Sequence, residues 1–287
     1  MENKPNLGIP VAIVIAGVVV AGAIVFSTTK TPATATIQSP QMASVFTAAK
    51  DLKLNENKFQ KCVDNKTMAD IVSKQHKAGE TLGVTGTPHS IIVLKNGAYF
   101  TINGAYPYNV VDLALSAALA GVKTNKIQGF LDLLADQKTT DATINTYIKK
   151  EFDPAMTAYT KNGSKSAISE KPASDEQVLP QDKKDLINTV GHIQGDSNAP
   201  IMVAEYSDPE CPFCARFHTT MEQVFEKYGK NGNITWRYTH FFPFDGNPNV
   251  HVNSRAYAEA TECAGSVGGE DAYWSLLKTI IAKAGQQ

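Results

Sequence analysis

The chain has 287 residues, of which 43% are hydrophobic and 19% charged, and its 27 basic and 28 acidic side chains nearly cancel. This apolar fraction suffices for a sizeable core and excludes a disordered chain, while the charge balance argues against a nucleic-acid binder, which would carry a basic excess. Four cysteines are too few for a disulfide-dense scaffold, and the length allows one large domain or two small ones.

The N-terminal segment, residues 1–30, is predicted to anchor the protein in a membrane. No charged residue lies between Lys4 and Lys30, and about 20 apolar residues within this stretch suffice for a transmembrane helix. A cleaved signal peptide is the alternative, but its apolar core would be shorter, and the best cleavage motif, Ala33-Thr34-Ala35, lies far downstream. We favour an uncleaved anchor, followed by a tether over residues 31–41.

The next block, residues 42–121, is predicted to contain helices and a β-hairpin. Apolar residues recur at helical spacing twice before the pattern changes to that of strands. The dipeptide Asn96-Gly97 then indicates a two-residue hairpin turn, and Asn109 and Gly121 are suited to the two ends of a helix. In order, two helices, two strands and a helix are predicted over residues 42–53, 68–82, 90–95, 98–103 and 110–120.

Residues 122–187 are expected to be helical at first and then flexible. Apolar side chains at helical spacing within 127–134 and 144–152 predict two helices before Pro154. From 161 to 184 the chain has no aromatic residue, few branched apolar residues and many charges. We therefore expect a linker with little fixed structure there.

The last block, residues 188–287, contains the motif Cys211-Pro212-Phe213-Cys214 directly after an apolar strand and before a helix. The helix is predicted to begin at Pro212 and to stop at Gly229. In order, the block is predicted to hold a strand, this helix, a second strand and two more helices, over residues 201–206, 212–229, 234–240, 253–264 and 270–283.

The paired cysteines indicate redox chemistry. Two thiols separated by two residues at a helix start can close a reversible disulfide. With Pro212 in the first helical position, Cys211 would occupy the N-cap, where free amides and the helix dipole lower the pKa of a thiol. We expect Cys211 to attack and the more buried Cys214 to resolve. Zinc would need a second close ligand pair, whereas Cys62 and Cys263 stand alone, so no metal is predicted. A purely structural disulfide between Cys211 and Cys214 is the other alternative, but so short a loop constrains little of the unfolded chain.

A family resemblance adds to this interpretation. Residues 195–218 (GDSNAP followed by IMVAEYSDPECPFCARFH) resemble the opening of a DsbA-like thiol:disulfide oxidoreductase of the thioredoxin superfamily, and 238–243 and 258–264 continue the likeness. Residues that precede this segment in the chain, including 58–63 (KFQKCV) and 83–88 (GVTGTP), resemble the closing segment of the family. The two halves therefore stand in swapped order.

The likeness extends over residues 42–121 and 190–285, about 60% of the chain. It implies an α/β protein with a thioredoxin fold, a helical insertion and no cofactor. Residues 42–121 would be the family's C-terminal half and residues 188–287 its N-terminal half. The swapped order is explained best by circular permutation, with new ends near Met42 and Gln287; exchange of halves between two chains and a rearranged sequence are the alternatives.

The resemblance also implies roles for single residues. Thr87-Pro88 would be a cis peptide that faces Cys211 and offers backbone to an extended substrate, which Pro212 and Phe213 would also border. Glu205 matches the family's buried acid, which assists proton transfer at the cysteines; an ordinary solvated glutamate is the alternative.

The remaining two cysteines, Cys62 and Cys263, match a second pair seen in part of the family. They would form a structural disulfide across the helical insertion, with two free buried thiols as the alternative.

These inferences predict a membrane-anchored, single-pass protein of the cell membrane whose catalytic domain is extracytoplasmic. It would form, reduce or isomerise disulfides in cysteine-containing exported proteins, and a membrane or extracytoplasmic redox partner would recycle it. The sequence does not choose among oxidation, reduction and isomerisation. The alternative function is a catalytically weak peptide-binding or assembly factor that keeps the fold for docking.

Overall fold

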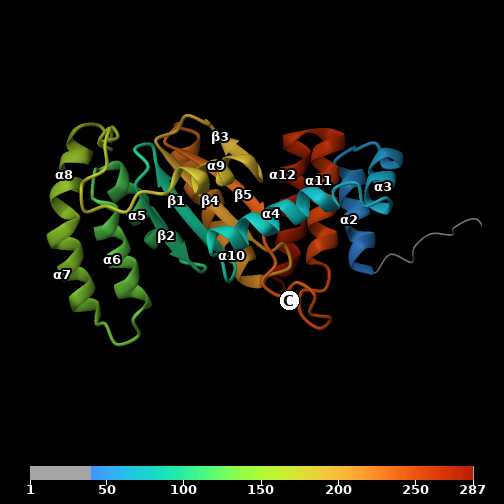
Figure 1. Ribbon diagram of the computed structural model, residues 1–287, viewed down its shortest axis with the longest axis horizontal. Helices are drawn as coiled ribbons and strands as arrows, with labels where there is room; N and C mark the ends of the chain where they lie inside the picture. Colours follow the sequence, from blue (N-terminus) through green and yellow to red (C-terminus); the bar gives the residue numbers. More distant parts are fainter. Residues whose placement is uncertain (1–39, 287) are drawn as a thin grey trace, which may run out of the picture. The chain divides into compact units, whose positions relative to one another are not determined.

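A five-stranded mixed sheet forms the centre of the part of the chain that the computed structural model describes, residues 40–286 (Figure 1). The strand order is β2-β1-β4-β5-β3, in which β4 and β5 are parallel and the other neighbours antiparallel. The strands are β1 (His89–Leu94), β2 (Tyr99–Asn103), β3 (His192–Gly195), β4 (Ile201–Ser207) and β5 (Ile234–His240). This mixed α/β architecture is consistent with the expected thioredoxin fold.

Helices surround the sheet. They are α2 (Pro40–Asp51), α3 (Glu56–Asp64), α4 (Ala69–Leu82), α5 (Tyr108–Leu119), α6 (Thr124–Ala135), α7 (Asp141–Glu151), α8 (Asp153–Lys161), α9 (Gln181–Thr189), α10 (Pro212–Val224), α11 (Ser254–Gly268) and α12 (Glu270–Ala284). A π-helical turn, η1 (Phe225–Gly229), extends α10.

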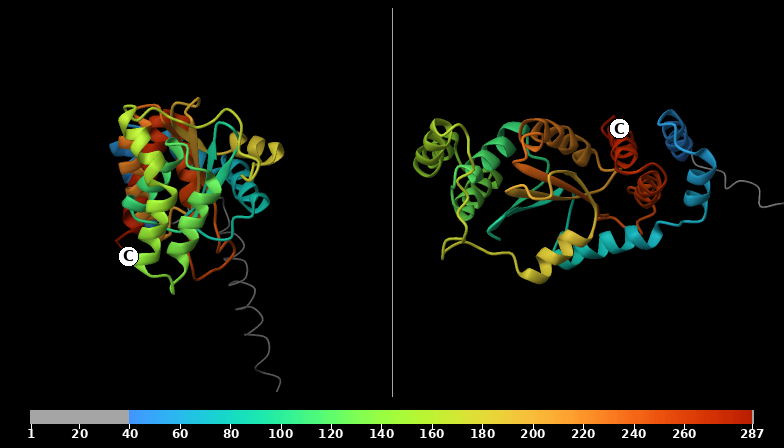
Figure 2. Two further views of the ribbon diagram at one scale, coloured as in Figure 1. Left: turned by 90° about the vertical axis from the view of Figure 1, so that its left-hand side faces the viewer. Right: turned by 90° about the horizontal axis from the view of Figure 1, so that it is seen from above.

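The two faces of the sheet bury different sets of side chains, because successive residues of a strand point to opposite sides. Val203 and Trp236 join the core formed with α5 and α10, whereas Ala204 and Tyr206 join a second core with Ile187 of α9. Figure 2 shows α4 and α9 on the opposite face of the sheet from α5 and α10. The cysteine-bearing helix α10 therefore lies over the face to which Val203 points.

Strand β1 is paired with β4 although more than 100 residues separate them along the chain. The antiparallel register runs from His89 opposite Tyr206 to Leu94 opposite Ile201. The segment before β1 and the segment after β4 therefore lie side by side, where the start of β1 meets the end of β4.

Four helices pack together in a cluster with an apolar core of its own. Residues of α2, α3, α11 and α12 share one apolar core, in which Val45 and Ala49 are buried with Leu276 and Ile280. The first and last described helices therefore pack in the same layer.

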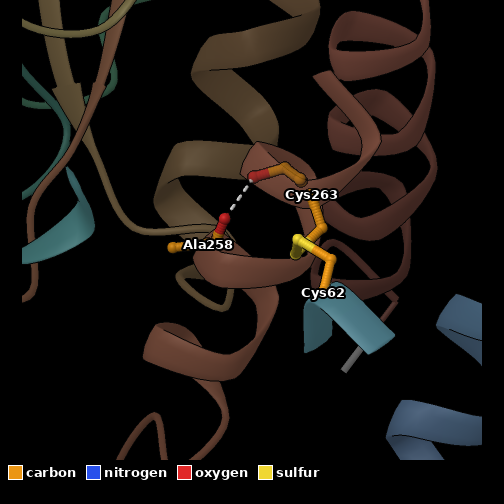
Figure 3. Close-up of a disulfide and its surroundings, with 4 residues drawn as sticks. Cys62, Ala258 and Cys263 are labelled. Atoms are coloured by element: carbon orange, nitrogen blue, oxygen red, sulfur yellow. Dashed lines mark hydrogen bonds between the residues drawn. A yellow bond between two sulfur atoms is a disulfide. The ribbon is translucent and has the colours of Figure 1, made fainter. Parts of the chain in front are cut away.

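A disulfide links this helical cluster. Cys62 of α3 and Cys263 of α11 are bonded across a sequence separation of 201 residues (Figure 3). The bond joins the two blocks, residues 42–121 and 188–287, covalently.

A buried polar network joins the helical cluster to the sheet. The Glu262 carboxylate lies 2.9 Å from His192 Nε2 and accepts a hydrogen bond from Gln75 Nε2 at 2.6 Å. Gln75 Oε1 in turn accepts from the amide of His240 at 2.9 Å. Although burial opposes it, the hydrogen bond and charge of His192 lower the pKa of Glu262. The network connects α4, α11, β3 and β5.

The expected membrane anchor at residues 1–30 lies outside the described residues, as does the expected tether apart from its last two residues, which belong to α2. Within residues 40–286, no helix combines the length and the apolar character needed to cross a membrane.

The segment predicted to be a linker is ordered along the sheet edge. The amide of Tyr99 donates to the carbonyl of Gln177, and the amide of Leu179 donates to the carbonyl of Gly97. Ile168 and Leu179, two of its few apolar residues, are buried. The expectation of little fixed structure is corrected here, because the edge strand β2 supplies backbone partners that composition does not reveal.

Several other elements differ from the predictions. Helices α3, α8 and α9 and strand β3 were not expected as separate elements, and α5 begins at Tyr108 with Pro107 at its N-cap, two residues earlier than Asn109 suggested. Pro154 does not end the helical region: it lies in the first turn of α8, where proline is tolerated.

We predict that removing the long-range disulfide destabilises the fold. The double substitution Cys62→Ala, Cys263→Ala releases the closure of a chain segment about 200 residues long, so the free energy of unfolding should fall by about 2 to 5 kcal/mol. Urea unfolding of the variant beside the wild type measures this difference. An unchanged unfolding midpoint would show that the bond contributes nothing to stability.

Candidate active site

Cys211 occupies the N-cap of α10, directly after the loop that leaves β4. Pro212 holds the first helical position, where its missing N–H costs no hydrogen bond. The amide of Cys211 donates to the Asp208 carbonyl at 3.1 Å, which turns the chain into the helix. Only 5% of the Cys211 residue surface is exposed, and Cys214 in the first turn is fully buried. Both are free thiols.

The two thiols have opposite electrostatic environments. A hydrogen bond from the Cys214 thiol, opposed by burial and helped by the amides of Cys214 and Phe213, lowers the pKa of Cys211 to about 6. Burial raises the pKa of Cys214 well above its usual range, and the neighbouring Cys211 raises it further. Near neutral pH the structure therefore favours a thiolate at Cys211 and a thiol at Cys214.

Thr87 and Pro88 face this thiol from the other block of the chain. Their peptide bond is cis and immediately precedes β1. The Cys211 sulfur lies 3.8 Å from the Thr87 carbonyl oxygen. The β1–β4 pairing thus brings Thr87-Pro88 and the cysteine pair together.

Phe213 and Pro212 lie on the outside of the site. Phe213 is 54% exposed, and the Arg216 guanidinium lies 4.7 Å from the centre of its ring. The side chains of Pro212 and Phe213 are exposed beside the nearly buried Cys211. They are therefore accessible from solvent.

Glu205 is fully buried in β4, on the face covered by α10. Its Oε2 accepts a hydrogen bond from Trp236 Nε1 at 2.9 Å, and its Oε1 has no hydrogen-bond partner among the described residues. Burial raises the pKa of Glu205 to about 7. A carboxyl group with such a pKa can exchange a proton near neutral pH.

Tyr238 is the neighbour of Glu205 in β5 and is itself fully buried. Burial raises the pKa of Tyr238 well above its usual range, and the charges of Glu205 and Cys214 raise it further. Tyr238 is therefore near both the buried acid and the Cys214 thiol.

Two residues near the cysteines were not predicted. The amide of Asp208 donates to the Cys214 sulfur at 3.4 Å, and its buried carboxylate lies 2.9 Å from His251 Nδ1. Asp208 stands only three residues before Cys211, so its proximity was available from the sequence. His251 lies 40 residues beyond Cys211, and no local pattern indicates that it returns to the site.

Cys62 and Cys263, by contrast, belong to the helical cluster and its disulfide, not to the site around Cys211. Within residues 40–286, no three His, Cys, Asp or Glu side chains are grouped so as to hold a metal ion.

Comparison with known proteins identifies part of the chain. Residues 188–287 match the thioredoxin family model. This segment is a thioredoxin-like domain. Such a domain suggests thiol:disulfide oxidoreductase activity, and the segment contains Cys211, Cys214 and Glu205.

The curated relatives that match the chain are much longer. The Na(+)/H(+) antiporter NhaA 1 of Salinispora arenicola is 30% identical over 95 residues, which cover 33% of this chain and 13% of that protein. NhaA 1 of Mycobacterium sp. strain KMS is 36% identical over 77 residues, or 27% of this chain and 12% of that protein. The match therefore spans about an eighth of the length of these relatives. No solved structure matches the chain significantly.

The buried acid generates a prediction about stability and pH. The pKa of Glu205 is about 7 in the folded protein and 4.5 for the ordinary side chain. As the pH rises between these values, folding must take up a proton that the ionised unfolded state has lost, and above pH 7 the folded state must bury the charge, so the wild type is progressively destabilised. Glu205→Gln removes this cost, and its gain in unfolding free energy over the wild type should grow from pH 4.5 to pH 8 by up to about 3 kcal/mol.

Urea unfolding of the oxidised proteins at the two pH values measures this gain, because the active-site thiols do not titrate in the disulfide form. Glu226→Gln, on the surface, is the matched control and should show little change. A gain for Glu205→Gln that is the same at both pH values would contradict the raised pKa.

Proposed function

We propose that this chain is a DsbA-like thiol:disulfide oxidoreductase that acts on cysteine-containing exported proteins. The observation that carries the proposal is the asymmetry of one thiol pair. Cys211, with its pKa lowered to about 6, faces the Thr87 carbonyl, while Cys214 is buried one turn into the helix. A lowered pKa provides the thiolate that disulfide exchange requires.

In the oxidising direction, a substrate thiolate attacks the Cys211 sulfur of the Cys211–Cys214 disulfide. The bond between the two cysteines breaks, and Cys214 leaves as a thiolate that takes up a proton. A second substrate thiolate then attacks the substrate sulfur of the mixed disulfide, and Cys211 leaves as a thiolate. Two electrons pass from the substrate dithiol to the enzyme. Reduction follows the reverse sequence, in which Cys211 attacks and Cys214 resolves.

Glu205 is proposed to exchange the proton of Cys214. Its pKa of about 7 suits both proton uptake and release near neutral pH, and Tyr238 is close to both groups. Thr87 and Pro88 are proposed to present backbone to an extended substrate, and the exposed Phe213 and Pro212 to contact its side chains.

We further propose that the swapped order of the two blocks is a circular permutation within one chain. In support, α2 and α12 share an apolar core, the disulfide links α3 to α11, and β1 pairs with β4. Residues 122–187 then connect the family's last helix to its first strand.

The site of action is proposed to be the extracytoplasmic side of the cell membrane, with residues 1–30 as a single-pass anchor. A membrane or extracytoplasmic redox partner would restore the cysteine pair after each turnover.

Activity assays with Cys211→Ser test the proposed reaction. We expect the wild type to accelerate both insulin reduction by dithiothreitol and refolding of reduced RNase, and Cys211→Ser to reduce either rate to the uncatalysed level, because the attacking sulfur is lost. Cys62→Ala with Cys263→Ala is the matched cysteine control and should retain activity where folded. Equal rates for wild type and Cys211→Ser would favour the peptide-binding or assembly factor instead.

A further inference from the structure

We propose that His251, held by Asp208, is a positioning residue that stabilises the Cys211 thiolate through its imidazolium charge. The inference rests on the proposed function, because it assigns a role within that exchange reaction. The dipeptide between the cysteines, Pro212-Phe213, carries no charge, so the motif itself supplies no cation to the thiolate.

The loop that carries His251 is tied directly to the loop that precedes Cys211. His251 Nδ1 lies 2.9 Å from Asp208 Oδ2, and Ser254 Oγ donates to Asp208 Oδ1 at 2.5 Å. Asn253 donates two hydrogen bonds to the Glu210 carboxylate, one from its backbone N–H at 2.7 Å and one from its side-chain Nδ2 at 2.9 Å. Since Glu210 is the neighbour of Cys211 and Asp208 contacts both cysteines, these four bonds hold His251 beside the thiol pair.

The imidazole is fixed in one orientation. The φ angle of His251 is 52°, a left-handed conformation that a non-glycine residue adopts only when its surroundings impose it. Its ring makes an edge-on contact with Phe244 at 5.2 Å, and 17% of its side chain is exposed. Asp208, fully buried, bonds Nδ1 and so orients the ring.

The charges around His251 favour its cationic form. The hydrogen bond that His251 Nδ1 donates to the Asp208 carboxylate raises the pKa of His251 against the effect of burial, and the charges of Asp208, Cys211 and Glu210 raise it further. These three groups have the largest electrostatic effects on the ring, and the charged side chains of Asp245 and Arg255 line the same pocket. Because the pKa of Cys211 is about 6, a window exists above this pH in which thiolate and imidazolium are present together.

The cation would act at the step in which Cys211 leaves. When the second substrate thiolate attacks the mixed disulfide, the sulfur–sulfur bond breaks and its electron pair stays on Cys211. An imidazolium nearby stabilises this charge and so stabilises the reduced enzyme relative to its disulfide. His251 would therefore make the pair a stronger oxidant.

Titration of the Cys211 thiolate by its absorbance at 240 nm tests the inference. In His251→Gln, which keeps a donor for Asp208 but no charge, the midpoint should rise by about one unit, and alkylation by iodoacetamide at pH 5 should slow about tenfold. Asn253→Ala is the matched control: it removes only the Nδ2 bond to Glu210, while the backbone bond of residue 253 and the two bonds to Asp208 still hold the imidazole in place, so its midpoint should match the wild type. A wild-type midpoint in folded His251→Gln would overturn the inference.

A second measurement needs no variant. Since the coupling between two charges is reciprocal, oxidation of the cysteine pair, which removes the thiolate, should lower the pKa of His251 measured by NMR in the wild-type protein. An identical His251 pKa in the reduced and oxidised protein would also overturn the inference. Failure of the proposed function is a separate result: both titrations would behave as expected, while the wild type would catalyse neither insulin reduction nor RNase refolding.

Discussion

The pairing of β1 with β4 is the constraint on which the site depends. It joins residues 89–94 to residues 201–206 in antiparallel register, so the peptide before β1 and the loop after β4 leave the sheet at the same edge. The Thr87 carbonyl and the Cys211 sulfur meet there for this reason. A slip of β4 by one residue would turn every one of its side chains to the opposite face and would carry Glu205 away from α10, which bears Cys214.

The same geometry makes two chemically identical thiols different. Cys211 lies at the N-cap, where backbone amides and the neighbouring thiol favour the charged form, whereas Cys214 lies one turn further in and is excluded from water. The sheet places Glu205 and Tyr238 beneath the helix on the side of Cys214. Charge is thus favoured at the outer sulfur and disfavoured at the inner one.

Local patterns were sufficient to predict the elements that carry the site, and insufficient for those defined by their partners. Asn96-Gly97 and the apolar runs beside it indicated the β1–β2 hairpin, and Pro212 indicated the start of α10. Strand β3 has little apolar alternation and depends on its pairing with β5. Composition predicted little fixed structure for residues 161–184, yet backbone hydrogen bonds tie Gln177 to Tyr99 of β2 and Leu179 to Gly97 in the hairpin turn.

The residues of the site also fall into those that the sequence predicted and those that it did not. The cysteine motif was predicted from its local spacing at a helix start, whereas Pro88 and Glu205 were named because a family resemblance connected distant segments. The contact between Asp208 and His251 was not, since 43 residues separate them and the left-handed turn at His251 is imposed by tertiary contacts. Sequence patterns report local preferences, whereas this pair results from the way two loops pack.

Two blocks of one chain build the site, and the long-range disulfide, although it lies outside the site, reports whether both blocks belong to the same chain. Cys62 belongs to one block and Cys263 to the other, so exchange of halves between two chains would make the bond intermolecular. The decisive measurement is the mass of the denatured, unreduced and alkylated protein, with mapping of its cysteine peptides. The account predicts a single 31.0 kDa chain in which the peptides of Cys62 and Cys263 are linked; a covalent dimer, or both cysteines recovered as alkylated free thiols, would contradict it.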